Sequence, residues 1–304
     1  MARGLRLPAL VLVAALASPV PTGAWLRAQG SRTWAFPRDL GAHPGFRTEW
    51  WYFSGNLEDA RGGRYGYQLT FFRTGLRQAP LFPRNPWSVR DVFMAHLAVT
   101  DGPGRSFRYA ERAARPGPGL AGAAREDLEV WLFNWEARRT PDGAIRLRGS
   151  ARDFGVELVL EPVKPIVLHG AGGLSRKGPR PGQASYYASI PRLATRGTLT
   201  LAGRSVEVGG ASWFDHEFGS NPLGPDQEGW DWTGLHLSDR RDLMLYVLRR
   251  ADGTLEPASS GTLVEPGGRA VHLPLASFSF GALGTWTSPR SGARYPSGWR
   301  IRVP

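Results

Sequence analysis

Glycine and proline interrupt this chain at short intervals along its whole length. The 304 residues include 39 glycines and 25 prolines, and the segments between them run for roughly eight to fifteen residues. Many of these segments alternate between apolar and polar side chains, as half-buried β-strands do; examples are 92–100, 128–136, 145–150, 156–161 and 197–201. Helical periodicity is confined to 109–115 and 121–127. The pattern predicts an all-β protein of the sandwich or barrel type.

One tryptophan-rich segment occurs twice. Residues 49–57 (EWWYFSGNL) are similar to residues 228–236 (EGWDWTGLH), so that Trp51 corresponds to Trp230. A short charged turn and an alternating apolar strand follow each copy, which predicts two hairpins of one design. Because internal repeats indicate repeated structural units, we predict two related antiparallel β-barrels, over 34–222 and 226–304.

The two copies have unequal lengths of chain. The second has about 79 residues, fewer than an eight-stranded barrel needs. The final residues, 299–304, alternate like a strand that has just begun. We therefore expect the second barrel to be truncated, so that this chain is a fragment; the alternative is a naturally small second sheet.

The N-terminus has the features of an export signal. Arg3 and Arg6 precede a short apolar run, 7–17, and small residues near 18 and 24 offer cleavage sites. The run is shorter than the roughly 20 residues of a membrane-spanning helix. We predict a signal peptide over 1–24 and a periplasmic or secreted protein, with an uncleaved membrane anchor as the alternative. Because the chain has no cysteine, its stability must come from a hydrophobic core rather than from disulfides.

The net charge of +12 does not predict a nucleic-acid partner. Of the 38 basic residues, only Lys164 and Lys177 are lysines. The arginines are scattered, without a run of five or more basic residues and without a basic helix. This bias is better explained by codon composition than by a binding face.

Standard catalytic signatures are absent from the sequence. The closest match to a Gly-x-Ser-x-Gly elbow, around Ser212, lacks the second glycine. There is no His-Glu-x-x-His motif, and no two histidines have the spacing of metal ligands on one element. We therefore predict neither a bound metal nor an organic cofactor.

A group of titratable residues lies within the aromatic run 212–220. If this run is a strand, Asp215 and Glu217 face one side and His216 faces the other. An acid buried in apolar surroundings has a raised pKa and can act as a general acid near neutral pH. The alternative is that both acids bind a loop or pair with arginines at a barrel rim.

Aromatic and polar residues of the repeat are candidates for a ligand site. Asp231 stands between two tryptophans at the place where the first copy has a tyrosine. Such aromatic walls form either a protein core or a ligand pocket inside a wide barrel. His96, on another predicted strand, is either a satisfied interior histidine or a ligand contact. The candidate ligand-binding residues are Glu49, Trp51, Tyr52, His96, Trp230 and Trp232.

Several ordered motifs together resemble one known family. They are HPGFRTEWWY (43–52), YQLTFF (67–72), LHG (168–170) with GLSRKG (173–178), ASYY (184–187), WFDHEFGS (213–220) and GWDWTG (229–234). From 34 to 304 the chain resembles the AttH-like family, also described as carotenoid 1,2-hydratase-like. The resemblance implies two consecutive lipocalin-like barrels, and members usually continue beyond the point where this chain ends.

The resemblance and the residues leave three functions open. The first is a hydratase that adds water to an alkene of an isoprenoid, with Asp231 or Asp215 as the acid and His216 as its orienting partner or water activator; Glu217 is a further catalytic candidate. The second is a carrier of a lipid or another hydrophobic small molecule. The third is a secreted hydrolase. We also consider peripheral contact with a membrane, whereas the sequence does not indicate an oligomeric state.

Overall fold

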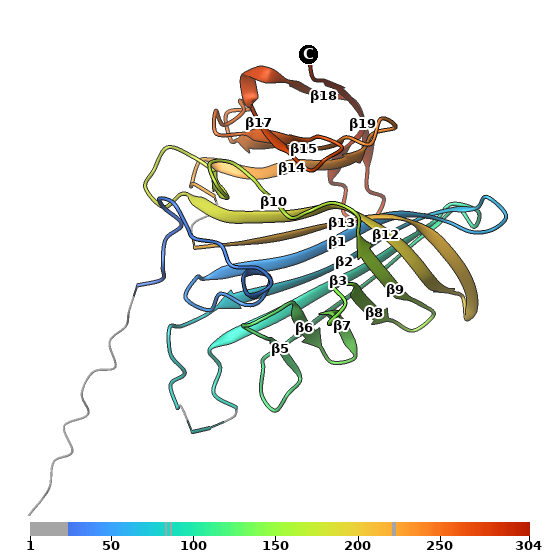
Figure 1. Ribbon diagram of the computed structural model, residues 1–304, viewed down its shortest axis with the longest axis horizontal. Helices are drawn as coiled ribbons and strands as arrows, with labels where there is room; N and C mark the ends of the chain where they lie inside the picture. Colours follow the sequence, from blue (N-terminus) through green and yellow to red (C-terminus); the bar gives the residue numbers. More distant parts are fainter. Residues whose placement is uncertain (1–23, 83, 86, 221–222) are drawn as a thin grey trace, which may run out of the picture.

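The computed structural model describes residues 24–82, 84–85, 87–220 and 223–304 (Figure 1). All but the last residue of the predicted signal peptide, 1–24, lies outside the described residues. The described chain is all-β, as predicted, and contains only two short 3₁₀ turns, η1 (Arg38–Leu40) and η2 (Leu275–Ser277), besides its strands. Within these residues, no helix has the length and apolar character needed to cross a bilayer.

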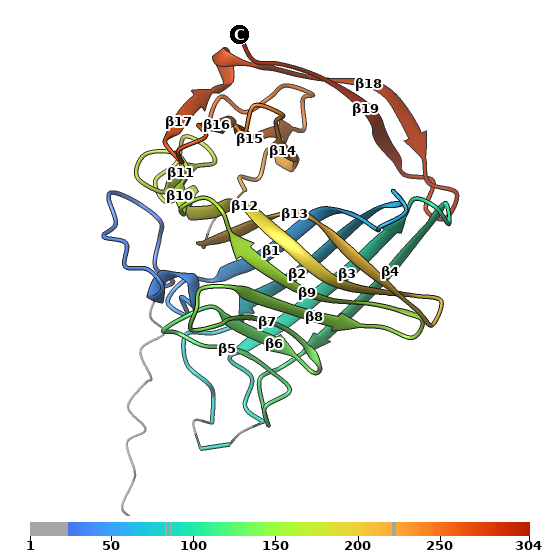
Figure 2. The same ribbon diagram turned by 45° about the vertical axis from the view of Figure 1, so that its right-hand side comes forward.

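Thirteen antiparallel strands form the first sheet, which curls into a nearly closed barrel (Figure 2). The order is β4-β3-β2-β1-β13-β12-β9-β8-β7-β6-β5, and β10 and β11 pair with β12. The strands are β1 (Thr48–Glu58), β2 (Arg64–Gly75), β3 (Asp91–Asp101), β4 (Ser106–Ala114), β5 (Ala121–Ala123), β6 (Glu129–Leu132), β7 (Trp135–Arg139), β8 (Ile145–Ser150), β9 (Phe154–Pro162), β10 (Val167–Leu168), β11 (Leu174–Arg176), β12 (Ala184–Leu201) and β13 (Arg204–Gly219). Arg112 of β4 also contacts the other side of the barrel, where its Nη2 donates to the Ser150 carbonyl at the end of β8 at 3.0 Å.

A hydrophobic core fills the interior of this barrel. Side chains alternate between the two faces of each strand, so that Trp51 and Phe53 point inward while Trp50 and Tyr52 point outward. Trp51 and Phe53 pack with Leu69 and Phe71 of β2 in one continuous cluster. Of the two alternatives for the aromatic walls, a protein core or a ligand pocket inside a wide barrel, the core describes this interior, which stabilises the fold by burying apolar surface.

The rest of the chain forms two smaller antiparallel sheets over one outer face of the barrel (Figures 1 and 2). The four-stranded sheet has the order β14-β15-β16-β17, and β18 pairs with β19. Their bounds are β14 (Gln227–His236), β15 (Asp242–Arg250), β16 (Ser260–Val264), β17 (Ala270–Pro274), β18 (Ser279–Thr287) and β19 (Arg294–Arg302). One face of β15 packs Met244, Tyr246 and Leu248 against residues of the first sheet.

Buried ionic contacts join the second sheet to the first. Asp242, at the start of β15, lies 2.6 Å from Lys164 Nζ and 2.7 Å from Arg192 Nη2. Arg192 belongs to β12, and Lys164 follows β9. Because a buried charge needs a partner, these contacts fix how the two sheets meet.

The structure confirms both hairpins of the repeat, β1–β2 and β14–β15, but the corresponding tryptophans have different surroundings. Trp51 is buried inside the barrel, whereas its counterpart Trp230 is 52% exposed and lies outside it. Two other expectations were wrong. The single strand expected over 128–136 is two strands, β6 and β7, separated by a turn at Phe133, and the expected helical turns fall on β4 and β5.

Candidate active site

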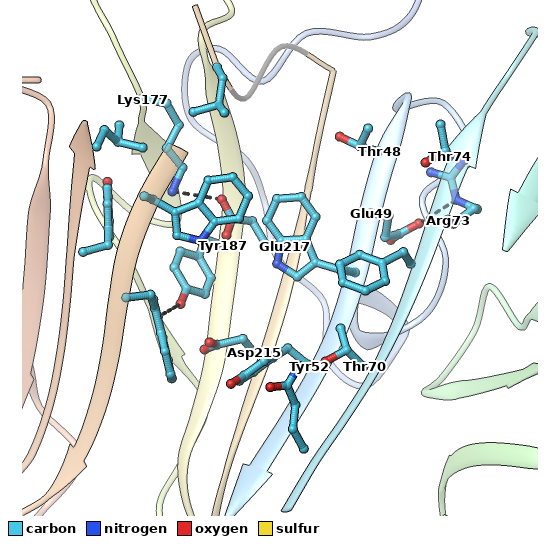
Figure 3. Close-up of a pocket in the computed structure, with 18 residues that line it drawn as sticks. Thr48, Glu49, Tyr52, Thr70, Arg73, Thr74, Lys177, Tyr187, Asp215 and Glu217 are labelled. Carbon is cyan, nitrogen blue, oxygen red and sulfur yellow. Dashed lines mark hydrogen bonds and ion pairs between the residues drawn. The ribbon is translucent and has the colours of Figure 1, made fainter. Parts of the chain in front are cut away.

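A cavity of about 470 Å³ lies between the outer face of the barrel and the second sheet (Figure 3). Strands β1, β2, β12 and β13 contribute one wall, and β14 and β15 contribute the other. The aromatic residues in its lining are Trp50, Tyr52, Phe72, Tyr187, Trp230, Trp232 and Tyr246. This size and composition are typical of a site for a small apolar molecule.

Strand alternation brings two carboxyl groups to this cavity. Asp215 and Glu217 of β13 line it, whereas His216, between them, points into the barrel. The sequence pattern predicted this division. On the adjacent strand β1, Tyr52 is paired with Asp215 and Trp50 with Glu217, so aromatic side chains flank both acids.

The Asp215 carboxyl group is buried and hydrogen-bonded. Trp213 Nε1 donates to Oδ1 at 2.6 Å, and the Ser189 hydroxyl donates to the same oxygen. Burial raises the pKa of Asp215 to about 7; hydrogen bonds from Ser189, Trp213 and Tyr187 act against this rise, and the charge of Glu217 adds to it. Because two donors already occupy Oδ1, the proton of the neutral acid belongs on Oδ2.

A chain of hydrogen bonds continues from Asp215 into the second sheet. His169 Nε2 lies 2.6 Å from Ser189 Oγ, and its Nδ1 lies 2.8 Å from Thr262 Oγ1 of β16. Burial, together with the charges of Lys177 and His272, lowers the pKa of His169 to about 3. His169 is therefore a neutral histidine whose two nitrogens connect Ser189 to Thr262, so residues of both sheets orient the acid.

Glu217 forms an ion pair at the cavity wall. Its Oε1 lies 3.0 Å from Lys177 Nζ and accepts a hydrogen bond from Ser185. Lys177 Nζ also lies 4.1 Å from the centroid of the Tyr246 ring. Burial acts to lower the pKa of Lys177, but the neighbouring Glu217 and Tyr246 outweigh it and raise this pKa. The pair therefore adds polarity to the cavity without adding net charge.

Glu49 lies at the end of the cavity and belongs to a buried network. His216 Nε2 and His43 Nδ1 lie 3.0 and 2.9 Å from its Oε1, and Arg73 Nε donates to Oε2 at 3.0 Å. Although burial acts to raise the pKa of Glu49, its bonds to the two histidines hold that pKa far below its usual range.

The same three residues have the spacing of a metal site. The ligand atoms of His43, Glu49 and His216 lie within 4.8 Å of one another. However, the carboxylate that would face the metal already binds the Arg73 guanidinium, and a second cation there would be repelled. The arrangement fits a hydrogen-bond network that attaches the segment before β1 to the barrel.

The structure brings six of the ten predicted site residues to the cavity: Asp215, Glu217, Glu49, Tyr52, Trp230 and Trp232. The other four lie elsewhere. Asp231 is on the opposite face of β14 from Trp230 and Trp232, with its Oδ2 3.2 Å from Arg249 Nε. His216 and Trp51 belong to the barrel interior, where Trp51 Nε1 donates to the Leu40 carbonyl at 2.9 Å.

His96 is on the outer face of β3 and not in the barrel interior. Its ring lies 5.2 Å from that of Phe72, and its Nε2 is 4.0 Å from Glu111. Sequence reasoning missed Ser189, His169 and Lys177 as site residues. The only signals were the hydroxyl-rich run 184–189 and the glycine-rich segment 169–182, both of which contain motifs of the family resemblance.

The fold and the cavity define a lipocalin-like β-barrel protein with a buried acid in an aromatic pocket. The sequence model of the AttH-like family matches residues 27–304, and the chain belongs to that family. It is 34% identical to a protein from Nitrosomonas europaea described as an AttH, whose crystal structure superposes with a TM-score of 0.82 over 91% of this chain and 84% of that one. Kievitone hydratase from Nectria haematococca shares the fold at 15% identity, with a TM-score of 0.64 over 92% of this chain and 82% of that one. A comparison with curated protein sequences finds no match.

Proposed function

We propose that this protein binds an isoprenoid or lipid in the cavity between its sheets and adds water to an alkene of that ligand. The observation that carries the proposal is Asp215, a buried carboxyl group with a pKa of about 7 in an aromatic cavity. An acid that is protonated near neutral pH can donate its proton to a substrate. Aromatic walls exclude bulk water and bind an apolar molecule.

Hydration of an isolated alkene begins with proton transfer to carbon. The proton on Asp215 Oδ2 adds to one alkene carbon, and the other carbon becomes a cation. Trp50, Trp230 and Trp232 line the same cavity, and an indole face stabilises a desolvated cation by about 2 kcal/mol. A water molecule then attacks the cation and returns one proton to the Asp215 carboxylate, so that the product gains one hydrogen and one hydroxyl group.

The hydratase proposal is tested with isoprenoid alkenes in ¹⁸O-labelled water. We expect the wild-type protein to convert geraniol, squalene or lycopene to a product that contains the label, as measured by mass spectrometry. Asp215→Asn keeps the shape of the side chain but lacks the acidic proton, and its conversion should fall by at least about a hundredfold.

Asp231→Asn is the matched control. It makes the same chemical change at an acid on the far face of β14, and we expect conversion close to the wild-type rate. Retained conversion in Asp215→Asn together with a loss in Asp231→Asn would identify Asp231 as the acid instead.

A carrier of a hydrophobic ligand is the second candidate, because an aromatic cavity supports binding with or without chemistry. Native mass spectrometry of purified protein distinguishes the two: a carrier releases an intact ligand and leaves alkenes unchanged. The hydrolase alternative lacks a serine or cysteine nucleophile at the cavity, since none of the described lining residues is of either type and Ser189 is only 1% exposed.

Two further points belong to this proposal. The name of one structural neighbour, kievitone hydratase, agrees with hydration, although the proposal depends on the cavity itself. Export to the periplasm or the medium stays a prediction from the N-terminal sequence, as does contact with a membrane.

A further inference from the structure

A second cavity continues from the first along the strands of the barrel. Its volume is about 280 Å³, and it shares Tyr52 and Gln68 with the larger cavity. The strand registers show how the two are arranged. On the outer face of β1, Trp50 and Tyr52 line the larger cavity, while Tyr52, Ser54 and Asn56 line the smaller one. The two cavities therefore meet end to end at Tyr52.

Asp215 lies at this junction. It pairs with Tyr52 across β13 and β1, and Tyr52 pairs with Thr70 of β2. Figure 3 shows these three side chains together toward one end of the larger cavity. The next cross-strand pair whose side chains lie on the outer face of the barrel is Ser54 and Trp213, and both residues line the smaller cavity. A molecule that filled both cavities would thus present an interior part, rather than its end, to the acid.

The chemistry of the smaller cavity differs from that of the larger one. Its polar lining residues are Tyr52, Ser54, Asn56, Tyr67, Gln68, Thr100 and His236. None of the described residues that line it is an aspartate, glutamate, lysine or arginine. Burial lowers the pKa of His236, and its Nε2 lies 2.9 Å from the Pro191 carbonyl, so the ring is neutral and Nδ1 is an acceptor.

Such a lining binds uncharged polar groups. Hydroxyl and amide side chains can donate to and accept from a ligand hydroxyl or carbonyl group. A carboxylate or phosphate would lose its hydration there without meeting a cation, which is unfavourable.

We propose that the two cavities form one elongated binding site, and that its substrate is a long molecule with an apolar body and an uncharged hydrogen-bonding end. The apolar part occupies the larger cavity, and the hydroxyl or carbonyl end occupies the smaller one. This inference rests on the proposed function, because Asp215 acts on the part of the ligand at the junction. It excludes fatty acids and isoprenoid diphosphates as the preferred ligands.

Three probes and three variants test this inference by isothermal titration calorimetry. Geranylgeraniol is long and uncharged, geranylgeranoic acid is equally long and charged, and geraniol is short enough for the larger cavity alone. Gly66→Leu fills the smaller cavity: a Cβ at Gly66 would meet Thr100 Cβ at 3.7 Å, an ordinary contact. Arg64→Leu is the matched control, two residues away on the same strand and outside both cavities.

We expect wild-type protein to bind geranylgeraniol at least about tenfold more tightly than geranylgeranoic acid. Gly66→Leu should lower the affinity for geranylgeraniol by about tenfold or more and leave the affinity for geraniol unchanged. Arg64→Leu should change neither affinity. Asn56→Leu, on the neighbouring strand, should repeat the loss and replaces Gly66→Leu if that variant does not fold.

Different failures have different meanings. If both cavity-filling variants bind geranylgeraniol as the wild type does, the smaller cavity is not part of the site, although the hydrophobic site stands. Equal affinity for geranylgeraniol and geranylgeranoic acid would overturn the inference that the substrate has an uncharged end. If none of the three probes binds the wild-type protein, the proposed function fails together with this inference.

Discussion

The proton on Asp215 depends on a few neighbouring side chains rather than on burial alone. Ser189 and Trp213 both donate to Oδ1, which limits how far burial raises the pKa. Because the single hydroxyl proton of Ser189 goes to Asp215, His169 Nε2 donates to Ser189. An acid with a pKa near the working pH can both give up its proton and take it back.

The raised pKa of Asp215 should make protein stability depend on pH. The folded carboxyl group has a pKa of about 7, compared with an ordinary value of 3.8, so the folded state binds the proton more tightly. The free energy of unfolding therefore falls as the pH rises toward 7, and above pH 7 the ionisation of Asp215 changes it no further. Relative to Asp215→Asn, the wild-type free energy of unfolding should fall by roughly 3 kcal/mol between pH 5 and pH 8. Urea denaturation at each pH measures this, and a difference that does not vary with pH would contradict the raised pKa.

Removing Ser189 should raise the pKa of Asp215 further. The Ser189 hydrogen bond lowers this pKa, so Ser189→Ala should move the ionisation of Asp215 to higher pH, and with it the alkaline limit of any hydratase activity. The infrared band of the protonated carboxyl group, identified by its loss in Asp215→Asn, reports this directly. Thr195→Val is the control, because that hydroxyl is also on β12 but binds Ser212 inside the barrel. A shift of equal size in both variants would rule out a specific effect of Ser189.

At the scale of strands and hairpins, local patterns predicted much of the structure. Alternation correctly separated Asp215 and Glu217 from His216, because neighbouring side chains on a strand point to opposite faces. It did not show that 128–136 turns back at Phe133, which adopts a φ of 57°. Residues 109–114 pair with β3 as part of β4, and such cross-strand pairing outweighs a weak local preference for helix.

Strand β13 contains a glycine whose replacement should be costly. A Cβ at Gly210 would lie 2.1 Å from the Asn56 carbonyl oxygen of β1, and backbone atoms cannot move aside without disturbing the ladder. We expect Gly210→Ala to lower the free energy of unfolding by about 1–3 kcal/mol. Chemical denaturation measures the change.

The adjacent glycine provides a matched control. At Gly209 the closest atom to an added Cβ would be the Thr195 carbonyl oxygen at 3.7 Å. Gly209→Ala should therefore be neutral or slightly stabilising, since alanine reduces the entropy of the unfolded chain. Equal losses in the two variants would show that the contact with Asn56 is not the cause.

At the scale of the whole molecule, the position of the site was beyond the sequence. The repeat predicted both hairpins, but it did not show which face of β14 would be covered, so Asp231 was a candidate although it lies away from the cavity. Ser189, His169 and Lys177 come from β12 and the segment before it. Lys177 lines the cavity, and His169 connects Ser189 to Thr262 of the second sheet, a contact that exists only because the two sheets pack together. No local pattern records how two sheets dock.

The docking itself should depend on Asp242. Its carboxylate is fully buried between Lys164, which follows β9, and Arg192 of β12, and Asp242→Asn would leave both cations without their anionic partner. We expect the free energy of unfolding to fall by about 3–5 kcal/mol.

Asp239→Asn, in the same hairpin turn, removes an exposed pair with Arg241 and should cost less than about 1 kcal/mol. Adding Lys164→Met to Asp242→Asn should recover part of the loss, because one unpaired buried charge is then gone. If Asp242→Asn costs no more than Asp239→Asn, the ionic contacts do not hold the sheets together, and the cavity between them depends on other contacts, such as the packing of Tyr187, Trp213 and Met244.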